Sequence, residues 1–152
     1  MPGYTFLSAF FPHRGLAIYI SNDIVYQCQQ HLFTSDAEFS ALWVKFKVQA
    51  HIAHFCFVYR SPSLAKDSTF NRNDSLSDSI SKILESCFDS EIIVAGDFNI
   101  HNSNWLHHSS HTSREGLYVE LFAENNNLKQ PVKEHWKEYC PNVEGVHEVW
   151  HS

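Results

Sequence analysis

The chain has 152 residues, of which 43% are hydrophobic and 14% aromatic, and its formal net charge is −6. This length and composition are typical of one globular domain with a substantial core, and they exclude a low-complexity protein. The acidic balance argues against a strong sequence-independent grip on nucleic acid, which normally needs clustered lysine and arginine.

The amino terminus, MPGYTFLSAFF, has no basic segment or small-residue cleavage site, so we expect no secretory signal. The longest apolar runs, about eight residues, are too short to span a bilayer. The cysteines show neither a CxxC pair nor zinc-type spacing, and we interpret Cys56 and Cys87 as small core residues. A reducing, intracellular compartment fits this usage best.

Three strands are predicted before residue 60. Gly15–Ser21 is short, apolar and β-prone, which indicates a buried strand. Leu42–Val48 alternates between an apolar face and a wetter face that carries Trp43, whereas Ile52–Tyr59 is apolar on both faces. The short connection between the last two predicts an antiparallel hairpin.

Two helices and another strand are expected next. We interpret Leu64–Asp74 as a polar loop, followed by a helix with an apolar stripe from Leu76 to Phe88. A buried strand covers Glu91–Gly96. Thr112–Glu115 has the pattern of a capping box and predicts a second helix, with one apolar face formed by Leu117, Leu121 and Phe122.

This order of strands and helices predicts an α/β layered domain without internal repeats. The segment from Pro131 onward has neither clear periodicity nor a convincing strand, and we expect it to be loosely structured.

The stretch VAGDFNIHNSNW, Val94 to Trp105, carries the main chemical signal. If the extended backbone continues past Gly96, then Asp97 and Asn99 point to one side and Phe98 points into apolar packing. A carboxylate at the carboxyl edge of a sheet can activate water or help to hold a cation, and an amide can donate to an oxyanion. The alternative is that both residues only form a turn or cap.

The Gly-Asp-Phe-Asn segment, followed by a histidine and a tryptophan, resembles the endonuclease/exonuclease/phosphatase superfamily, in particular the endonuclease domain of non-LTR retrotransposon reverse transcriptases. Further segments agree in order with that family over roughly residues 3 to 130. They are Gly3-Tyr4, GLAIYI (15–20), LWVK (42–45), VYRSP (58–62), Gly116 and NLKQ (127–130).

The resemblance implies a partial four-layered α/β sandwich of mixed, mostly antiparallel sheets flanked by helices, over residues 3–130, with a divergent tail at 131–152. It also implies cleavage of phosphoester bonds with a divalent cation, usually Mg²⁺. The implied partner is DNA and not a membrane.

The family's site residues map onto named positions of this chain. Asp97 matches the residue that activates the attacking water and contacts the metal, and Asn99 matches the residue that holds Asp97 and the phosphate in register. Tyr59 matches the tyrosine that donates to a nonbridging phosphate oxygen, although it is also a plausible aromatic end to a buried strand. Arg60 either contacts a phosphate or is a solvated loop cation, and His101 either contacts substrate or shapes the site.

The histidines after the motif suggest a metal cluster at first sight. Their spacing fits no zinc pattern, and no matching thiolate or carboxylate set accompanies them. We therefore do not assign a metal role to this group, which comprises His101, His107, His108 and His111.

Two functional parts of the family have no counterpart among these residues. The family's metal-binding glutamate, in a Gln-Glu-Thr-like segment before the Gly-Tyr element, is missing, and so is the Ser-Asp-His motif near the family's carboxyl end. The chain thus resembles a domain truncated at both ends. Loss of one comparable oxyanion donor costs roughly 10²–10³ in rate, so we expect weak or no activity.

Three hypotheses remain open at this point. The chain is a metal-dependent DNA endonuclease-type domain or part of one, or it is a catalytically inactive remnant that acts as a binding or structural protein. The third is an unrelated α/β binding module in which the Gly-Asp-Phe-Asn turn is structural.

Overall fold

The structure is a computed structural model that describes residues 3–11, 14–35, 39–48, 51–62, 66–86, 90–106, 109–129 and 148–151. Within these ranges the elements follow the order β1 (Tyr4–Phe11), β2 (Arg14–Ser21), β3 (Tyr26–Cys28), η1 (Gln30–Leu32), β4 (Thr34–Ser35), β5 (Phe39–Val48), β6 (His51–Arg60), α1 (Lys66–Ser86), β7 (Glu91–Asp97), α2 (Arg114–Asn125) and β8 (Glu148–His151).

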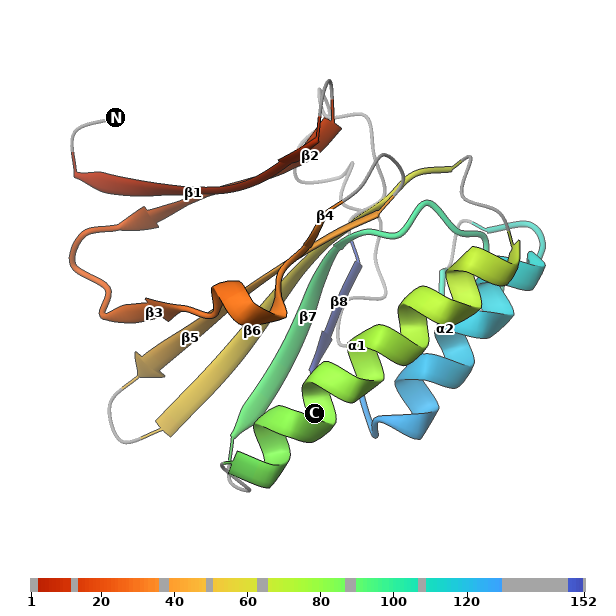
Figure 1. Cartoon of the computed structure of the whole chain (residues 1–152). Coiled ribbons are helices and arrows are strands. Elements are labelled where there is room, and N and C mark those ends of the chain that lie inside the picture. The colour runs from red at the N-terminus through yellow and green to blue at the C-terminus, as the bar shows by residue number, and fades with distance from the viewer. Residues whose placement is uncertain are drawn as a thin grey trace.

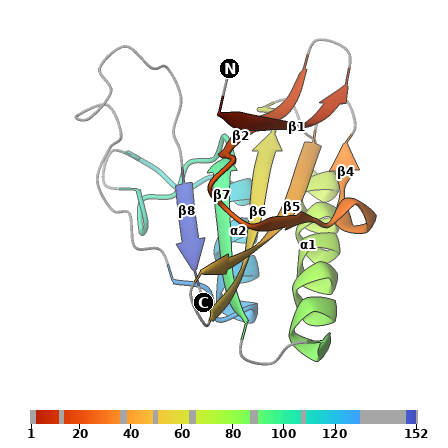
Figure 2. The ribbon, with the colours of Figure 1, turned by 90° about the vertical axis from the view of Figure 1, so that its left-hand side faces the viewer.

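The elements are arranged in layers (Figure 1). The antiparallel hairpin β1–β2, here called the hairpin sheet, lies on one face of a larger main sheet with the strand order β3-β5-β6-β7-β8 and with β4 also paired to β5. Helices α1 and α2 pack together on the opposite face of the main sheet (Figures 1 and 2). An α/β sandwich of two sheets flanked by helices is therefore confirmed.

One strand pairing differs from the others. β6 and β7 are parallel and are joined through α1, whereas every other pairing in the described part of the chain is antiparallel. The mixed, mostly antiparallel character that we expected is confirmed. Because β6 and β7 run in the same direction, their carboxyl ends meet at one edge of the main sheet.

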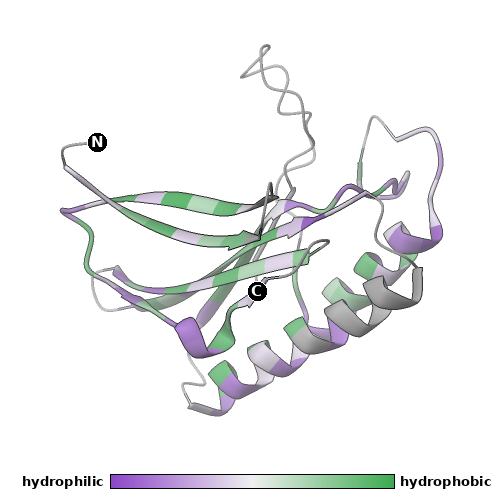
Figure 3. Ribbon diagram, turned by 45° about the horizontal axis from the view of Figure 1, so that its top comes forward, coloured by the Kyte–Doolittle hydropathy of each residue, from purple (hydrophilic) through white to green (hydrophobic). Residues whose placement is uncertain are grey.

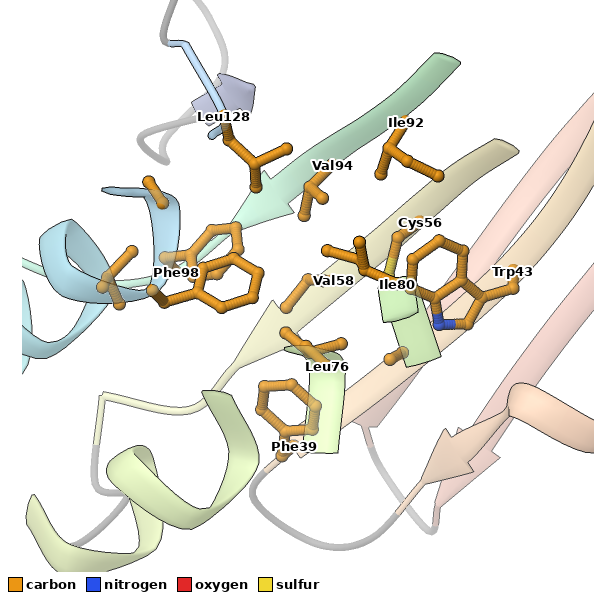
Figure 4. Close-up of a cluster of buried hydrophobic side chains, with 14 of the residues drawn as sticks. Phe39, Trp43, Cys56, Val58, Leu76, Ile80, Ile92, Val94, Phe98 and Leu128 are labelled. Atoms are coloured by element: carbon orange, nitrogen blue, oxygen red, sulfur yellow. The ribbon is translucent and has the colours of Figure 1, made fainter. Parts of the chain in front are cut away.

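The main core lies between the main sheet and the helices (Figure 4). Alternate residues of β5, β6 and β7 meet the apolar stripe of α1 there; among the buried residues are Phe39, Trp43, Cys56, Val58, Leu76, Ile80, Ile92, Val94 and Phe98. Figure 3 shows hydrophilic residues on the outer side of the coloured part of α1. A second cluster between the two sheets contains Ala9, Ile20, Leu42 and Val44.

The strands of the middle of the chain were predicted well. β2, β5, β6 and β7 cover the four expected segments, and β5 and β6 form the expected antiparallel hairpin. The wetter face proposed for β5 is wrong at Trp43, which is fully buried because α1 covers that face. Cys56 is buried as expected, and burial raises its pKa well above the ordinary value.

The interpretation of Leu64–Asp74 as a loop is wrong, since α1 begins at Lys66. That segment contains neither proline nor glycine, so polar residues extend the helix beyond the apolar stripe that marks its packed part. Cys87 and Phe88, at the end of the expected stripe, lie outside the described residues.

The second helix was placed correctly, but its details were not. Its N-cap is Ser113, whose Oγ accepts from the Gly116 backbone N–H at 3.1 Å. Thr112 instead uses its hydroxyl to accept from the Ser103 backbone N–H at 3.0 Å. The predicted apolar face is correct at Phe122 but wrong at Leu117 and Leu121, which are 47% and 49% exposed. The buried residues are Gly116, Val119, Phe122 and Ala123.

A short strand lies in the segment where none was expected. β8 pairs with β7 in antiparallel register from Ile93 to Gly96. Four residues are too few to show a recognisable alternation of apolar and polar side chains. The strand β8 is therefore recognised only from its pairing with β7. Residues 130–147 lie outside the described ranges, and no described helix is long and apolar enough to cross a membrane.

Gly96 permits the close pairing of β7 with β6. Its φ is +154°, and a Cβ added there would overlap the backbone carbonyl of Val58, its register partner on β6. Only glycine combines this conformation with so close an approach.

We predict that Gly96→Ala lowers the free energy of unfolding by roughly 3 kcal/mol or more, because it adds both backbone strain and a clash. Urea denaturation checks this, with Gly3→Ala as the control. Gly3 also has positive φ, but a Cβ there meets nothing within 4 Å, so its cost should be about 1 kcal/mol. Equal losses in the two variants would contradict the account.

His54 on β6 is a buried titratable group of the fold. It is 4% exposed, and its Nδ1 lies 2.8 Å from Oε1 of Gln29. Burial and, next, the positive charge of Lys45 lower the pKa of His54 to about 4. The folded protein therefore binds fewer protons than the unfolded chain between pH 6.5 and 4.

We predict that the stability contributed by neutral His54 is fully present above pH 6.5 and is lost as the pH falls toward 4. The test is the free energy of unfolding measured across that range. His54→Gln, which cannot titrate, should show a shallower decline, whereas His51→Gln, at an exposed position of the same strand, should follow the wild type. A decline identical in all three proteins would refute this role.

Candidate functional site

The parallel pairing of β6 and β7 brings together two of the predicted site residues. Tyr59 and Asp97 are register partners at the carboxyl ends of these strands, and both side chains are half-buried. Register partners lie on the same face of a sheet. Phe57, two residues before Tyr59, packs in the cluster between the two sheets, so Tyr59 and Asp97 lie on the face toward the hairpin sheet.

The backbone turns directly after Asp97. Asn99 has a φ of +47°, and its backbone N–H donates to Oδ1 of Asp97 at 3.0 Å. The condition for Asp97 and Asn99 to point to one side, an extended backbone through Asn99, is therefore not met, since β7 ends at Asp97. Phe98 is 1% exposed and packs in the main core, as expected. Asp97 thus combines a structural role in the turn with a carboxylate beside Tyr59.

The side chains of Arg60 and Asn99 each donate a hydrogen bond to the backbone carbonyl of the other residue. Nη1 of Arg60 donates to the carbonyl oxygens of Phe98 at 3.3 Å and Asn99 at 3.1 Å. In return, Nδ2 of Asn99 donates to the carbonyl oxygen of Arg60 at 2.7 Å. A hydrogen bond from a charged group contributes about 1.5–3 kcal/mol, so these contacts fix the turn firmly against the end of β6.

The buried position of Arg60 excludes the interpretation of this residue as a solvated loop cation. The residue belongs to β6 and is only 2% exposed, so it is not a solvated loop cation. Its guanidinium instead positions the backbone after Asp97. A direct contact of Arg60 with phosphate stays a prediction.

His101 is exposed, and its ring stacks on that of His111 with a centroid distance of 4.6 Å. Its carbonyl oxygen accepts from the Ser113 backbone N–H at 2.8 Å and lies so close to Gly116 that a Cβ there would overlap it. The backbone of His101 therefore ties the loop to the start of α2, while a contact of its ring with substrate stays a prediction. His107 and His108 lie outside the described residues.

Asn102 is a structural residue of this loop that the sequence did not reveal. It is fully buried, and its Nδ2 donates to Oε2 of Glu120 at 3.1 Å and to the Gly116 carbonyl at 3.3 Å. Its Oδ1 accepts from the Asn104 backbone N–H at 2.9 Å. Asn102 stands in a polar run without apolar periodicity, so no sequence signal indicates its burial.

The described residues fall short of a complete metal site. No group of three or more His, Cys, Asp or Glu side chains within them is placed to hold a metal ion. Asp97 offers one carboxylate, of which Oδ1 already accepts from Asn99. Since Mg²⁺ prefers oxygen ligands in an octahedral set, these residues alone do not fit the ion, and the role of Asp97 as its ligand stays a prediction.

Solved structures show the same fold. The chain matches the endonuclease domain of TRAS1, a telomere-specific non-LTR retrotransposon, at a TM-score of 0.71 and 11% identity, covering 99% of this chain and 67% of that one. It matches the Bacteroides thetaiotaomicron mannosyl-6-phosphatase at 0.64 and 12%, covering 100% and 64%. D. rerio TDP2 complexed with a single-strand DNA product gives 0.51 and 12%, covering 98% and 62%.

The chain thus spans about two thirds of the length of these structures. No curated protein sequence matches it. A family model described as endonuclease-reverse transcriptase matches residues 53–145, which is more than half of the chain and includes Tyr59 and the Gly-Asp-Phe-Asn turn. The unrelated binding module is therefore ruled out, and the chain belongs to the endonuclease-reverse transcriptase family of the endonuclease/exonuclease/phosphatase superfamily.

Proposed function

We propose that the chain is a DNA endonuclease-type phosphodiesterase unit from a retrotransposon-like protein, with Asp97 and Tyr59 as its reacting side chains. The single observation that supports this most is the register pairing of Tyr59 with Asp97 at the carboxyl ends of two parallel strands. A carboxylate beside a phenol on one face of a sheet edge can supply a general base for water and a hydrogen-bond donor to a phosphate oxygen, two functions that assist hydrolysis of a phosphodiester.

The chemistry assigns a different task to each group. Asp97 orients a water molecule and accepts its proton as the water oxygen attacks phosphorus. The Tyr59 hydroxyl donates to a nonbridging oxygen, where negative charge develops, and the ester P–O bond breaks. Asn99 acts as a positioning residue, because its backbone N–H holds Oδ1 of Asp97. The family generally uses a divalent cation, which would supply further charge stabilisation.

DNA is the proposed substrate. The support comes from the TRAS1 endonuclease domain and from TDP2, which was solved with single-strand DNA. The formal net charge of −6 argues that these 152 residues bind DNA weakly by themselves. Arg60 and His101 remain the candidates for contact with the phosphate backbone.

We expect the rate to be low. Asp97 is the sole carboxylate that we assign to the site, and neither a Gln-Glu-Thr segment nor a Ser-Asp-His motif occurs in the sequence. The same facts favour a second candidate, a catalytically inactive protein that binds or supports a partner. In that case the Asp97–Asn99 hydrogen bond serves only the turn.

We predict slow, Mg²⁺-dependent nicking of supercoiled plasmid that Asp97→Asn reduces by about 10² or more, because it removes the negative charge. Asparagine retains an Oδ1 that accepts from the Asn99 backbone N–H, so the turn is kept. Asp23→Asn, at an exposed position outside the site, makes the same change of charge and should leave the nicking rate unchanged.

Nicking that survives Asp97→Asn would contradict the assignment of Asp97. No nicking at any Mg²⁺ concentration, by a protein with a normal unfolding transition, would instead support the inactive alternative for this chain.

A further inference from the structure

A cavity of about 200 Å³ opens on the helix side of the main sheet, away from Tyr59 and Asp97. It lies between η1, β5, β6 and the end of α1, and it is lined by Gln29, His31, Leu32, Lys45, His54, Lys82, Ile83 and Ser86. His54 stands five residues before Tyr59 on β6, roughly 17 Å along the strand and on the opposite face. The cavity is therefore separate from the candidate catalytic site.

The lining is cationic in an acidic protein. Lys45 and Lys82 contribute ammonium groups and His31 a ring, and none of the residues that line the cavity is acidic. Lys45 is the register partner of His54 on the neighbouring strand, so their side chains are adjacent. With a formal net charge of −6 for the whole chain, this local positive charge favours an anion.

The cavity is also lined by a buried nitrogen, Nε2 of His54, whose hydrogen-bonding capacity is not used within the described part of the chain. His54 is 4% exposed, and Nε2 has no hydrogen-bond partner within the described residues. Nδ1 lies 2.8 Å from Oε1 of Gln29. Because an amide oxygen can only accept, we assign the hydrogen to Nδ1, which makes Nε2 a bare acceptor. A buried acceptor without a donor costs free energy, which a suitable ligand would recover.

The charged state of His54 agrees with this tautomer. With its pKa lowered to about 4 by burial and by Lys45, the ring is neutral at pH 7. The other titratable groups that line the cavity are His31 on η1, Lys45 on β5 and Lys82 on α1. The ligand must therefore present a hydrogen-bond donor to Nε2 and negative charge to the lysines.

We propose that this cavity binds a hydrogen phosphate ion. Its P–OH donates to Nε2 of His54, and its anionic oxygens accept from the ammonium groups of Lys45 and Lys82. The volume of about 200 Å³ corresponds to roughly seven water molecules at about 30 Å³ each, which is enough for a small tetrahedral anion and small for a nucleotide.

This arrangement distinguishes hydrogen phosphate from its closest analogues. Sulfate has the same shape but carries no proton at neutral pH, so it offers only acceptors to the bare Nε2. A phosphate monoester loses its last proton with a pKa of about 6 and has the same defect at higher pH. Hydrogen phosphate retains its P–OH under those conditions and is the anion that the cavity should select.

Isothermal titration calorimetry on the whole chain at pH 7.5 tests the proposal with inorganic phosphate, sulfate and methyl phosphate at equal ionic strength. We expect phosphate to bind at least about tenfold more tightly than the other two, since each of these leaves Nε2 without a donor. Lys82→Gln should weaken phosphate binding about tenfold through loss of a charged donor. Lys47→Gln, an exposed position on β5 outside the cavity, should have no effect.

Equal affinity for sulfate and phosphate would overturn the proposal, as would phosphate binding that Lys82→Gln leaves unchanged. The absence of binding by all three anions would overturn it as well. Lys82 is exposed, so its substitution should not disturb folding, and a melting curve verifies this. The measurement concerns binding away from Asp97, so its outcome is independent of nicking activity.

Discussion

The reciprocal hydrogen bonds between Arg60 and Asn99 are the constraint on which the site depends. They join the last residue of β6 to the turn that follows β7. Nη1 of Arg60 donates to the Asn99 carbonyl, and Nδ2 of Asn99 donates to the Arg60 carbonyl. A buried guanidinium needs such acceptors, and a non-glycine residue at positive φ needs compensation for its strain. The Asn99 carbonyl accepts from the buried guanidinium, and the hydrogen bonds with Arg60 offset the strain of the positive φ at Asn99.

The position of the candidate catalytic pair follows from this constraint. Gly96 lets β7 approach β6 closely, and the parallel register places Asp97 beside Tyr59. The strand then ends, because the turn hydrogen-bonded to Arg60 follows Asp97 directly. Asn102 and the His101 carbonyl then attach the following loop to α2. A fold of this kind also occurs in a mannosyl-6-phosphatase, in a retrotransposon endonuclease domain and in a protein solved with a single-strand DNA product. The side chains at this edge, more than the fold, therefore decide the chemistry.

Sequence patterns predicted the elements whose side chains repeat with a clear period. β2, β5, β6 and β7 were found from runs of apolar residues, and the packed part of α1 from its stripe. The patterns failed where contacts with residues distant in the sequence determine burial or secondary structure. Leu117, Leu121 and Phe122 were predicted as one apolar face, yet only Phe122 of the three is buried, together with Val119. The nearly three turns of α1 before Leu76 carry no apolar stripe. The short strand β8 was missed because only its pairing with β7 reveals it.

The candidate site shows the same division. The resemblance to the family was correct. The motif and its neighbours predicted Asp97, Asn99 and Tyr59 as site residues, and the structure places Tyr59 and Asp97 as register partners. The burial of Arg60 and Asn102 was not predictable, since each bonds to groups 14 or more residues away in the sequence. Asn99 has a left-handed backbone, and its Nδ2 donates to the Arg60 carbonyl, so the alternation of an extended strand does not describe the position of its side chain.

A double-mutant cycle on Arg60 and Asn99 tests this central constraint most directly. Arg60→Met removes the guanidinium donors, and Asn99→Gly removes the amide while tolerating the positive φ. If the two bonds support one turn together, loss of either frees the other, and the double variant should lose at least about 1 kcal/mol less stability than the sum of the single losses. Single losses that add within about 0.5 kcal/mol would show that the bonds are independent and would contradict the account.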